Sequence, residues 1–364
     1  MAKIIEDGKI GGFADYNNAT FRGTSVNRAS LAELPVIDVG PFVGSSSLTE
    51  RQSAAGHLRE ACIDIGFFYI AGHGIPQSEI DEAIAWGHRL FRLSLEDKLS
   101  LGLYGQDESG GYVGLGGNNP ESAARKPDIK ERFFMARDAI PGEPKEGNFA
   151  AGTMLWPNHP ELDGFTDFMK AHYEKRIKLA QQVVRAFALS LDLDEGFFSY
   201  MYRYLGATML FNYYPSLSPG EAAKNQWSFS PHTDYGMFTI LAQDGTGGLQ
   251  ARNSDGVWID VPPVDDTFVI NIGDMFAMWT NDLYASSLHR AMNYAGAPRI
   301  SMPMFTYPQG RTRISCLPTC QGPENPARYE PVIAGDYNDM LIAQSHRTGR
   351  PGISTGTAER FESV

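Results

Sequence analysis

The chain has 364 residues, of which 42% are hydrophobic and 20% are charged, and its formal net charge is −12. This length exceeds the usual size of one compact domain, although β barrels and sandwiches can run long as single units. No stretch is long and apolar enough to span a bilayer, and the acidic balance disfavours nucleic acid or an anionic membrane as a partner.

Cysteine usage and the first residues bear on the compartment. The three cysteines, Cys62, Cys316 and Cys320, are sparse and odd in number and form no C-x-x-C motif. This pattern favours a reducing compartment and argues against a thiolate zinc site. Residues 1–13 contain no apolar segment of the kind found in a secretory signal. We therefore expect a cytoplasmic globular protein with a large core.

The chain up to about residue 200 is predicted to be mainly helical after a polar start. Residues 1–33 are rich in Gly and Asn, so we expect an extension that lies over the surface. Leu58, Cys62 and Ile65 recur at helical spacing, and Gly66 is expected to end that helix. The other expected elements are strands at 34–39 and 67–70 and helices at 77–91, 95–99 and 165–189.

A glycine-rich stretch at 102–119 is expected to be a loop. Its sequence GGYVGLGGNN matches neither the dinucleotide-binding fingerprint nor a phosphate loop, because no Lys-Ser or Lys-Thr pair ends it. The stretch therefore predicts no nucleotide site.

After Gly206 the pattern changes to short apolar runs separated by Gly, Pro, Asn and Asp. Many short strands with turn residues between them indicate a sandwich or barrel. The expected strands are 209–214, 237–242, 257–261, 268–272, 275–279, 287–293 and 300–307. Past Pro318 the chain is polar, with a last helix expected near 337–345.

The stretch SPHTDYGMFTILAQD places His232 and Asp234 two residues apart in front of an apolar run. In a strand, residues i and i+2 point to the same face, so the two side chains are expected to lie side by side. A turn with an Asp cap and a structural histidine is the commoner interpretation of an isolated H-x-D. A second histidine from another strand would favour a metal site over this structural interpretation.

His289 supplies such a histidine. It lies in SSLHRAMNY, a predicted strand of the β region, whereas the other histidines fall in helical patterns, turns or the tail. Two histidines and one carboxylate match the facial triad of non-haem Fe(II) sites, which leaves the opposite face of the metal open. An enclosed zinc site would use four ligands, often with sulfur.

Polar residues on neighbouring strands indicate an anion site. Arg299 and Ser301 in PRISMPMF share a strand face, as do Asn212 and Tyr214 in FNYYP. An interior arginine is costly unless it meets a carboxylate, which its planar guanidinium can bind through two hydrogen bonds. An internal salt bridge at a barrel mouth is the alternative.

The ordered set of motifs resembles a known family. The sequence HTD, followed by LHR and RIS and preceded by NYYP, is similar to the 2-oxoglutarate/Fe(II)-dependent dioxygenases of the isopenicillin-N-synthase-like superfamily. LPVIDVGPF, ACIDIGFFYIAGHGIP, FRLSLEDK, SGGYVG, DIKERFF and TNDLYASSLHR are similar to family features in the same order. The resemblance covers roughly residues 34–310.

The resemblance implies an α+β fold with a mainly β core. A double-stranded β-helix (jelly-roll, cupin-like) barrel at 201–310 would carry the site. A helical N-terminal region at 34–200 would pack on it, after the extension at 1–33 and before a helical tail at 311–364. Three features depart from the family pattern: Ser216 replaces the usual second proline after NYYP, the extension has no counterpart, and the tail matches least.

Residue roles follow from the same resemblance. His232, Asp234 and His289 would hold Fe(II), while Arg299 and Ser301 would bind the distal carboxylate of 2-oxoglutarate. Tyr214 would help, and Asn212 would lie near the chelating end of the co-substrate. The implied reaction is the oxidation of a small organic molecule with O2, releasing succinate and CO2. Hydroxylation is the default outcome, and desaturation or cyclisation can use the same site.

Two other functions stay open at this point. An Fe(II) oxidase of the same fold could use Arg299 and Ser301 to hold a substrate carboxylate instead of 2-oxoglutarate. A barrel of the same shape could also be a non-catalytic small-molecule receptor. Zinc-dependent hydrolysis is weaker, because the sequence places no Glu or His base near the H-x-D motif.

Candidate substrate contacts are aromatic residues and a methionine: Tyr112, Phe133, Met304 and Phe305. They suggest a largely apolar small molecule, although a place in the core is the simpler explanation for most of them. Met304 and Phe305 are neighbours in a predicted strand, so only one of them is expected to face the pocket.

Overall fold

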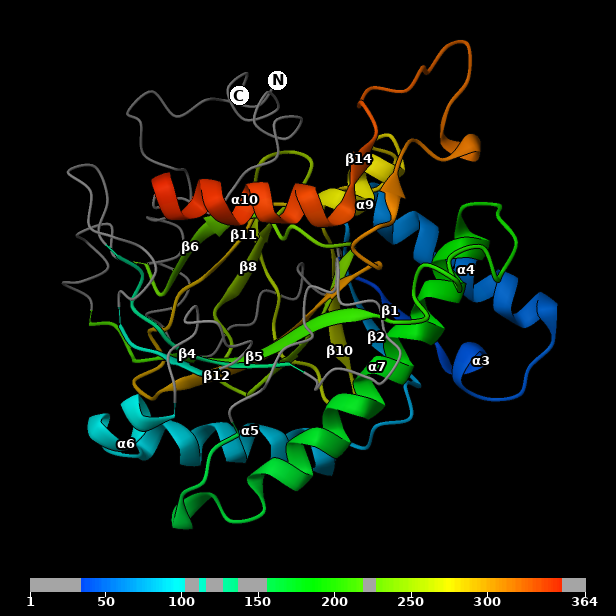
Figure 1. The fold of residues 1–364 in the computed structure, drawn as a ribbon. Coiled ribbons are helices and arrows are strands. Elements are labelled where there is room, and N and C mark those ends of the chain that lie inside the picture. The colour runs from blue at the N-terminus through cyan, green and yellow to red at the C-terminus, as the bar shows by residue number, and fades with distance from the viewer. Residues whose placement is uncertain (1–33, 102–110, 116–126, 137–155, 219–226, 349–364) are drawn as a thin grey trace.

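Two β sheets form the centre of the protein (Figure 1). The computed structural model describes residues 34–101, 111–115, 127–136, 156–218 and 227–348. The larger sheet has the order β1 (Val36–Asp38), β2 (Phe67–Ala71), β10 (Phe268–Ile272), β7 (Phe238–Gln243), β12 (Arg299–Tyr307), β5 (Gly206–Tyr214), β4 (Glu131–Met135), β3 (Gly111–Val113). The smaller sheet has the order β6 (Phe229–His232), β11 (His289–Ala291), β8 (Leu249–Arg252), β9 (Trp258–Asp260). All neighbours in both sheets pair antiparallel except β1 and β2.

The two sheets pack against each other through a buried apolar cluster. Tyr69, Leu241 and Val269 of the larger sheet meet Leu249 and Ile259 of the smaller one. Strand alternation then divides each strand of the larger sheet between two environments. On β12, residues 299, 301, 303 and 305 line a cavity between the sheets, whereas 300, 302 and 304 join the core on the other face.

Helices cover that other face of the larger sheet. Within the described residues the α-helices are α3 (Gly40–Val43), α4 (Leu48–Asp64), α5 (Gln77–Arg92), α6 (Leu95–Ser100), α7 (Phe165–Ser190), α9 (Asp274–Trp279) and α10 (Ala334–Thr348), and not all of them lie on this face. Helix α7 packs against α3, α4 and α5, and α5 also packs against β5 and β12. In Figure 1, α5 and α6 lie beneath β4, β5 and β12 of the larger sheet, and α10 runs across the top.

The start and the end of α4 follow directly from sequence. The Ser47 side chain accepts from the backbone N–H of Glu50, whose carboxylate in turn accepts from the Ser47 N–H at 2.8 Å. After the helix, Gly66 has a φ of +65°. A Cβ on this residue would lie 1.9 Å from the carbonyl oxygen of Ala285. Only glycine can take this position, so the predicted stop at Gly66 is confirmed.

Most of the expected elements are confirmed, and two are corrected. The run 275–279, expected as a strand, lies in the six-residue helix α9, whose residues are all buried. A short apolar run cannot be assigned to a buried strand or a buried helix by periodicity alone, which explains the error. In the glycine-rich stretch expected as a loop, Gly111–Val113 form β3. Most of that stretch, the extension at 1–33 and residues 349–364 lie outside the described residues.

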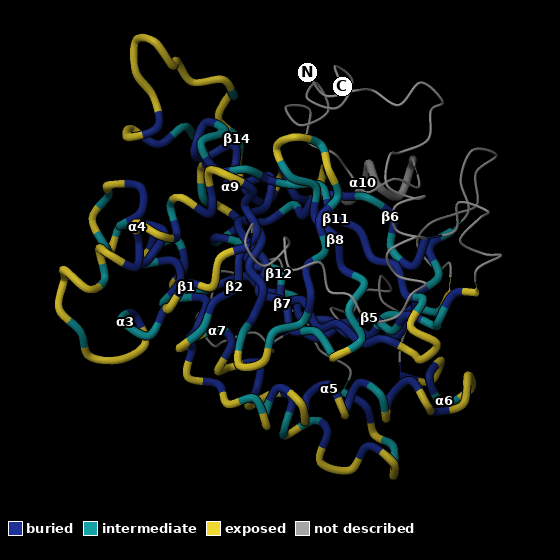
Figure 2. Tube along the Cα trace, turned by 180° about the vertical axis from the view of Figure 1, so that it is seen from behind, coloured by how far each residue is buried: buried dark blue, intermediate teal, exposed yellow. Residues whose placement is uncertain are grey.

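The segment before residue 200 is more than a helical cover, because it contributes β1 to β4 to the larger sheet. Figure 2 shows that the strands are largely buried and that exposed residues lie mainly on helix surfaces and connecting loops. Within the described residues, none of the helices combines the length and the hydrophobicity needed to cross a membrane.

Candidate iron and co-substrate site

The two histidines of the site lie opposite each other on neighbouring strands. His232 is the last residue of β6 and pairs in register with His289, the first residue of β11. Their ring centroids are 4.2 Å apart. This pairing explains how residues far apart in sequence meet, since antiparallel partners on one face have adjacent side chains.

Asp234 reaches the histidines by a route that the strand pattern does not predict. The expectation that His232 and Asp234 share a strand face is wrong, because β6 ends at His232 and Asp234 lies in the connection to β7. This connection crosses to the larger sheet in close contact with β12. A Cβ on Gly236 would be 2.4 Å from the carbonyl oxygen of Thr306.

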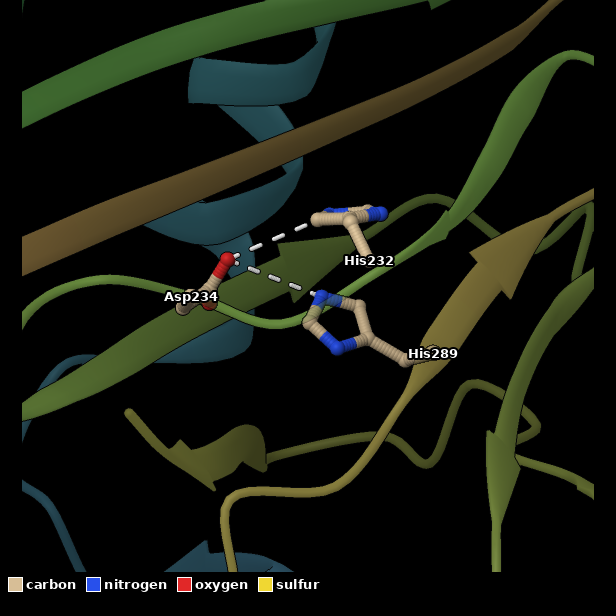
Figure 3. A group of neighbouring side chains, drawn as sticks. All are labelled: His232, Asp234 and His289. Carbon is tan, nitrogen blue, oxygen red and sulfur yellow. Dashed lines mark ion pairs between the residues drawn. The ribbon is translucent and has the colours of Figure 1, made fainter. Parts of the chain in front are cut away.

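The three side chains converge on one point (Figure 3). Asp234 Oδ1 is 3.6 Å from His289 Nε2 and 3.9 Å from His232 Nε2. One ligand atom from each residue lies within 4.8 Å of the others, and all three residues are buried. Octahedral ligands at metal bonds of ~2.1 Å are about 3 Å apart, so these atoms need to move little to hold a metal ion.

Hydrogen bonds fix the tautomer of both imidazoles. His232 Nδ1 lies 2.7 Å from the carbonyl oxygen of Ser230, and His289 Nδ1 lies 3.2 Å from that of Ser287. Because a carbonyl oxygen can only accept, each Nδ1 carries the proton and donates it. In the neutral form of each imidazole, Nε2 then carries the lone pair on the side of the point of convergence, as a metal ligand requires.

The carboxylate of Asp234 is oriented in the same way. Its Oδ2 accepts from the hydroxyl of Thr239 at 2.5 Å and from the amide of Asn271 at 2.7 Å. These two donors occupy Oδ2 and leave Oδ1 facing the imidazoles. The arrangement suits a carboxylate that binds a metal through one oxygen.

A second polar group lies on β12 and β5 of the larger sheet. Arg299 pairs with Tyr214, and Ser301 pairs with Asn212. The Ser301 hydroxyl lies 3.5 Å from both Asn212 Nδ2 and the Tyr214 hydroxyl. Burial raises the pKa of Tyr214, and Arg299 offsets part of that increase, so the phenol stays a neutral donor at physiological pH.

Arg299 is a buried cation with donor capacity to spare. It is 1% exposed, donates from Nη2 to Gln243 Oε1 at 2.9 Å, and lies 5.0 Å from the centroid of the Tyr214 ring. In the part of the chain that the structure describes, its Nε has no hydrogen-bond partner, and none of the ion pairs found there involves Arg299. The internal salt bridge considered above is therefore absent among these residues, and the guanidinium fits an external carboxylate.

A single cavity between the sheets connects the two polar groups. Its lining includes the residues predicted for both roles, which are His232, Asp234, His289, Asn212, Tyr214, Arg299 and Ser301. A separate and larger cavity, of about 410 Å³, lies between α5 and the end of the barrel. Among the described residues only the triad brings three possible metal ligands together, so the cavity between the sheets is the candidate site.

The four predicted substrate contacts separate into two groups. Phe305 lines the cavity, whereas Tyr112, Phe133 and Met304 belong to the core between the larger sheet and the helices. The expectation that only one of Met304 and Phe305 faces the pocket agrees with this alternation. We keep a substrate contact as a prediction for Phe305 and do not extend it to the three core residues.

Several residues of the site were not predicted from sequence. Phe229 stacks on His232 with ring centroids 3.8 Å apart, while Thr239 and Asn271 orient Asp234 and Gln243 contacts Arg299. A usable signal existed for Thr239 and Asn271, because each is a polar residue inside an apolar run that was expected to be a buried strand.

Comparison with known proteins agrees with this geometry. The family model for the 2OG-Fe(II) oxygenase superfamily matches residues 206–308. The model for the N-terminal region of non-haem dioxygenases in morphine synthesis matches residues 34–159. The 2-oxoglutarate-Fe(II) type oxidoreductase ppzC of Metarhizium rileyi is 34% identical, over 86% of this chain and 88% of its own. The oxidoreductase hxnY of Emericella nidulans, of the same described type, is 31% identical over 86% of this chain and 90% of its own.

Solved structures show the same fold. A full-length Neurospora crassa protein in complex with alpha-KG and thymine has a TM-score of 0.76 and 26% identity, covering 86% of this chain and 97% of that one. JOX2 in complex with 2OG, Fe and JA has a TM-score of 0.70 and 25% identity, covering 85% of each chain. The two-sheet barrel is thus the predicted double-stranded β-helix. The chain belongs to the 2OG-Fe(II) oxygenase superfamily and is a non-haem Fe(II)- and 2-oxoglutarate-dependent dioxygenase.

Proposed function

We propose that His232, Asp234 and His289 hold the Fe(II) of this dioxygenase. The observation that supports the assignment most strongly is the arrangement of the two histidines, whose Nδ1 atoms lie against backbone carbonyls while their Nε2 atoms converge with Asp234 Oδ1. Two neutral imidazoles and one carboxylate leave a net charge of +1 on a bound Fe(II). This donor set and charge suit an open site that must also accept an anionic co-substrate.

We further propose that Arg299 binds the distal carboxylate of 2-oxoglutarate, with help from Ser301 and Tyr214. Its guanidinium is buried and has a donor without a partner among the described residues. Asn212 lies beside Ser301 and its Oδ1 also has no partner there, and we propose that it lies near the chelating end of the co-substrate. Such contacts orient the co-substrate relative to the metal ligands and exclude water from it.

When bound together, iron and 2-oxoglutarate supply O2 activation coupled to decarboxylation of the co-substrate to succinate and CO2. The protein residues provide positioning and an enclosed apolar wall, and no side chain is needed as an acid or a base. Phe229 and Phe305 line this cavity beside the polar groups. We propose a small organic substrate with an apolar face, and hydroxylation as the default outcome.

Iron content and succinate formation test the assignment. The protein is loaded with Fe(II) under argon, and the iron per chain and the succinate formed from 2-oxoglutarate on exposure to air are measured. We expect one iron per chain in the wild type and in His57→Ala, whose histidine is exposed on α4. We expect His232→Ala to lose both iron and succinate formation. Retention of both by His232→Ala would remove the assignment.

A further inference from the structure

A buried carboxylate outside the triad contacts both chain segments that carry the candidate iron ligands. Asp274 is the first residue of α9 and is 0% exposed. Its two carboxylate oxygens accept hydrogen bonds from two hydroxyls that are far apart in sequence, those of Thr233 and Ser286. Burying a carboxylate is costly unless its oxygens accept hydrogen bonds. The two hydroxyls therefore stabilise Asp274 in its buried position.

The first contact joins Asp274 to the H-x-D segment. Thr233, which lies between His232 and Asp234, is 1% exposed, and its hydroxyl donates to Asp274 Oδ2 at 3.0 Å. The backbone N–H of Asp274 also donates to the carbonyl oxygen of Asp234 at 2.8 Å. The connection that carries Asp234 out of β6 is therefore fixed to α9 through both a side chain and the backbone.

The second contact joins Asp274 to the segment that leads to His289. The hydroxyl of Ser286 donates to Asp274 Oδ1 at 2.7 Å. The next residue, Ser287, provides the carbonyl oxygen that accepts from His289 Nδ1. One carboxylate thus connects the position of Thr233 with the backbone that orients His289.

The two hydrogen bonds that Asp274 accepts suit a carboxylate. Both hydroxyls donate, one to each oxygen, and only an ionised carboxyl group accepts at both of its atoms. An asparagine of the same shape would offer one acceptor and one NH₂ donor, so one of the two hydroxyls would have to turn from donor to acceptor. Charge-assisted hydrogen bonds of this kind are also stronger than those between neutral groups.

We propose that Asp274 is a positioning residue for the metal site. By holding the 232–234 segment and the 286–289 segment at a fixed separation, it presets the distance between His232, Asp234 and His289 before the metal binds. The inference rests on the proposed iron site. Its consequence is that loss of the contact lowers metal affinity even though Asp274 does not ligate the metal.

Titration with Co(II) alone, as a stand-in for Fe(II) that is stable in air, provides the test. The dissociation constant and the melting temperature with and without Co(II) are measured for Thr233→Val, Ser286→Ala and Asp274→Asn. Loss of a hydrogen-bond partner of a metal site weakens metal affinity by about 10–100-fold, so we expect roughly tenfold weaker Co(II) binding for each variant. The gain in melting temperature on adding Co(II) should fall accordingly.

Thr280→Val is the matched control. Thr280 lies just after α9 and is 0% exposed, and its hydroxyl donates to the carbonyl oxygen of Phe276. The substitution removes a buried hydroxyl from the same region without touching Asp274. We expect it to lower the melting temperature of the metal-free protein while leaving the Co(II) dissociation constant within about twofold, which separates a structural defect from a defect in metal binding.

The outcomes distinguish this inference from the assignment on which it rests. If wild-type protein does not bind Co(II), the metal site itself is wrong and the inference fails with it. If the wild type binds but Thr233→Val and Ser286→Ala bind equally well, the inference alone is overturned. A loss of affinity in Thr280→Val as large as in Ser286→Ala would also overturn it. If Asp274→Asn does not fold, the Co(II) affinities of Thr233→Val and Ser286→Ala still test the inference.

Discussion

The hydroxyl of Thr239 donates to Oδ2 of Asp234 at 2.5 Å, from the strand that follows the H-x-D motif. This contact leaves Oδ1 of the same carboxylate facing the two imidazoles. The two residues are five positions apart in the sequence, so the motif and its orienting partner lie in one continuous segment of the chain. The orientation of the proposed iron ligand is therefore determined locally.

Thr239→Val should weaken metal binding. The change keeps the shape of the side chain but removes one of the two donors to Oδ2, so the carboxylate can rotate. We expect Fe(II) or Co(II) affinity to fall about tenfold, in line with other losses of a ligand's hydrogen-bond partner. Thr306→Val is the control, because Thr306 is equally buried in the same sheet but donates to the carbonyl oxygen of Phe238. Equal affinities in the two variants would contradict the orienting role.

Arg299→Ala should raise the dissociation constant for 2-oxoglutarate sharply. Truncation of one partner in a buried charge-assisted contact costs about 2–5 kcal/mol, which corresponds to roughly 30-fold or more. The measurement is a titration of the Fe(II)-loaded protein with 2-oxoglutarate under argon. Gln243→Ala should have a smaller effect in the same direction, because Gln243 accepts from Arg299 and steadies it.

Arg203 provides the control for this prediction. Like Arg299 it lies near a tyrosine ring, that of Tyr204, at 5.6 Å, but it is exposed. Arg203→Ala should leave 2-oxoglutarate binding unchanged. If Arg299→Ala also binds 2-oxoglutarate as tightly as wild type, then Arg299 does not hold the distal carboxylate of the co-substrate.

Arg176→Met should destabilise the fold rather than the site. Arg176 of α7 is 0% exposed and donates to the carbonyl oxygens of Met302 at 3.1 Å and Ile240 at 2.5 Å. Pro303, next to Met302, has no backbone N–H, so it donates no hydrogen bond between β12 and β7. Two buried carbonyls would lose their donor, at about 1–3 kcal/mol each. We expect urea denaturation to show a free energy of unfolding lower by roughly 2–5 kcal/mol.

Arg185→Met is the comparison on the same helix. Arg185 is partly exposed and pairs with Glu195. Pairs of this kind contribute at most ~1 kcal/mol. A destabilisation by Arg176→Met no larger than that by Arg185→Met would show that the buried guanidinium does not support the sheet.

His172 should make folding sensitive to acid. Burial lowers its pKa from the ordinary 6.5 to about 4, and Glu79, its partner at 3.0 Å, has a lowered pKa as well. The unfolded chain binds a proton at His172 below pH 6.5, whereas the folded chain does so only near pH 4. Stability is therefore complete above pH 6.5 and falls as the pH decreases toward 4, by an amount on the order of 3 kcal/mol.

Replacement by a residue that does not titrate tests the sign of this effect. In His172→Gln the free energy of unfolding should fall less between pH 6.5 and pH 4 than it does in the wild type. His57→Gln, on the exposed face of α4, should keep the wild-type slope. If the free energy of unfolding of His172→Gln depends on pH as steeply as that of the wild type, His172 is not the source of the acid sensitivity.

The three residues proposed as metal ligands could be identified from the sequence, but their geometry could not. The H-x-D motif and a histidine in a later predicted strand suffice to indicate the triad, because together they supply the donor set of a non-haem iron site. That Asp234 lies outside β6 depends on the close approach of Gly236 to β12. Such a contact between distant segments leaves no periodic trace in the sequence.

The missing elements have similar causes. Strand β4 contains Glu131 and Arg132, whose charges conceal a strand that is largely buried in the larger sheet. Helix α9 is too short and too uniformly apolar to show a helical period. Asp274 contacts hydroxyls 41 residues before it and 12 residues after it, so only the folded chain brings the three together.

The most direct test of the iron and co-substrate assignment is an anaerobic titration of the metal-free protein. Fe(II) is added first and 2-oxoglutarate second, while the visible spectrum is followed for the charge-transfer band of the chelate. We predict that the band appears at one Fe(II) and one 2-oxoglutarate per chain, and that it is lost in His289→Ala. Iron binding without the band, or a band that persists in His289→Ala, would contradict the proposed site.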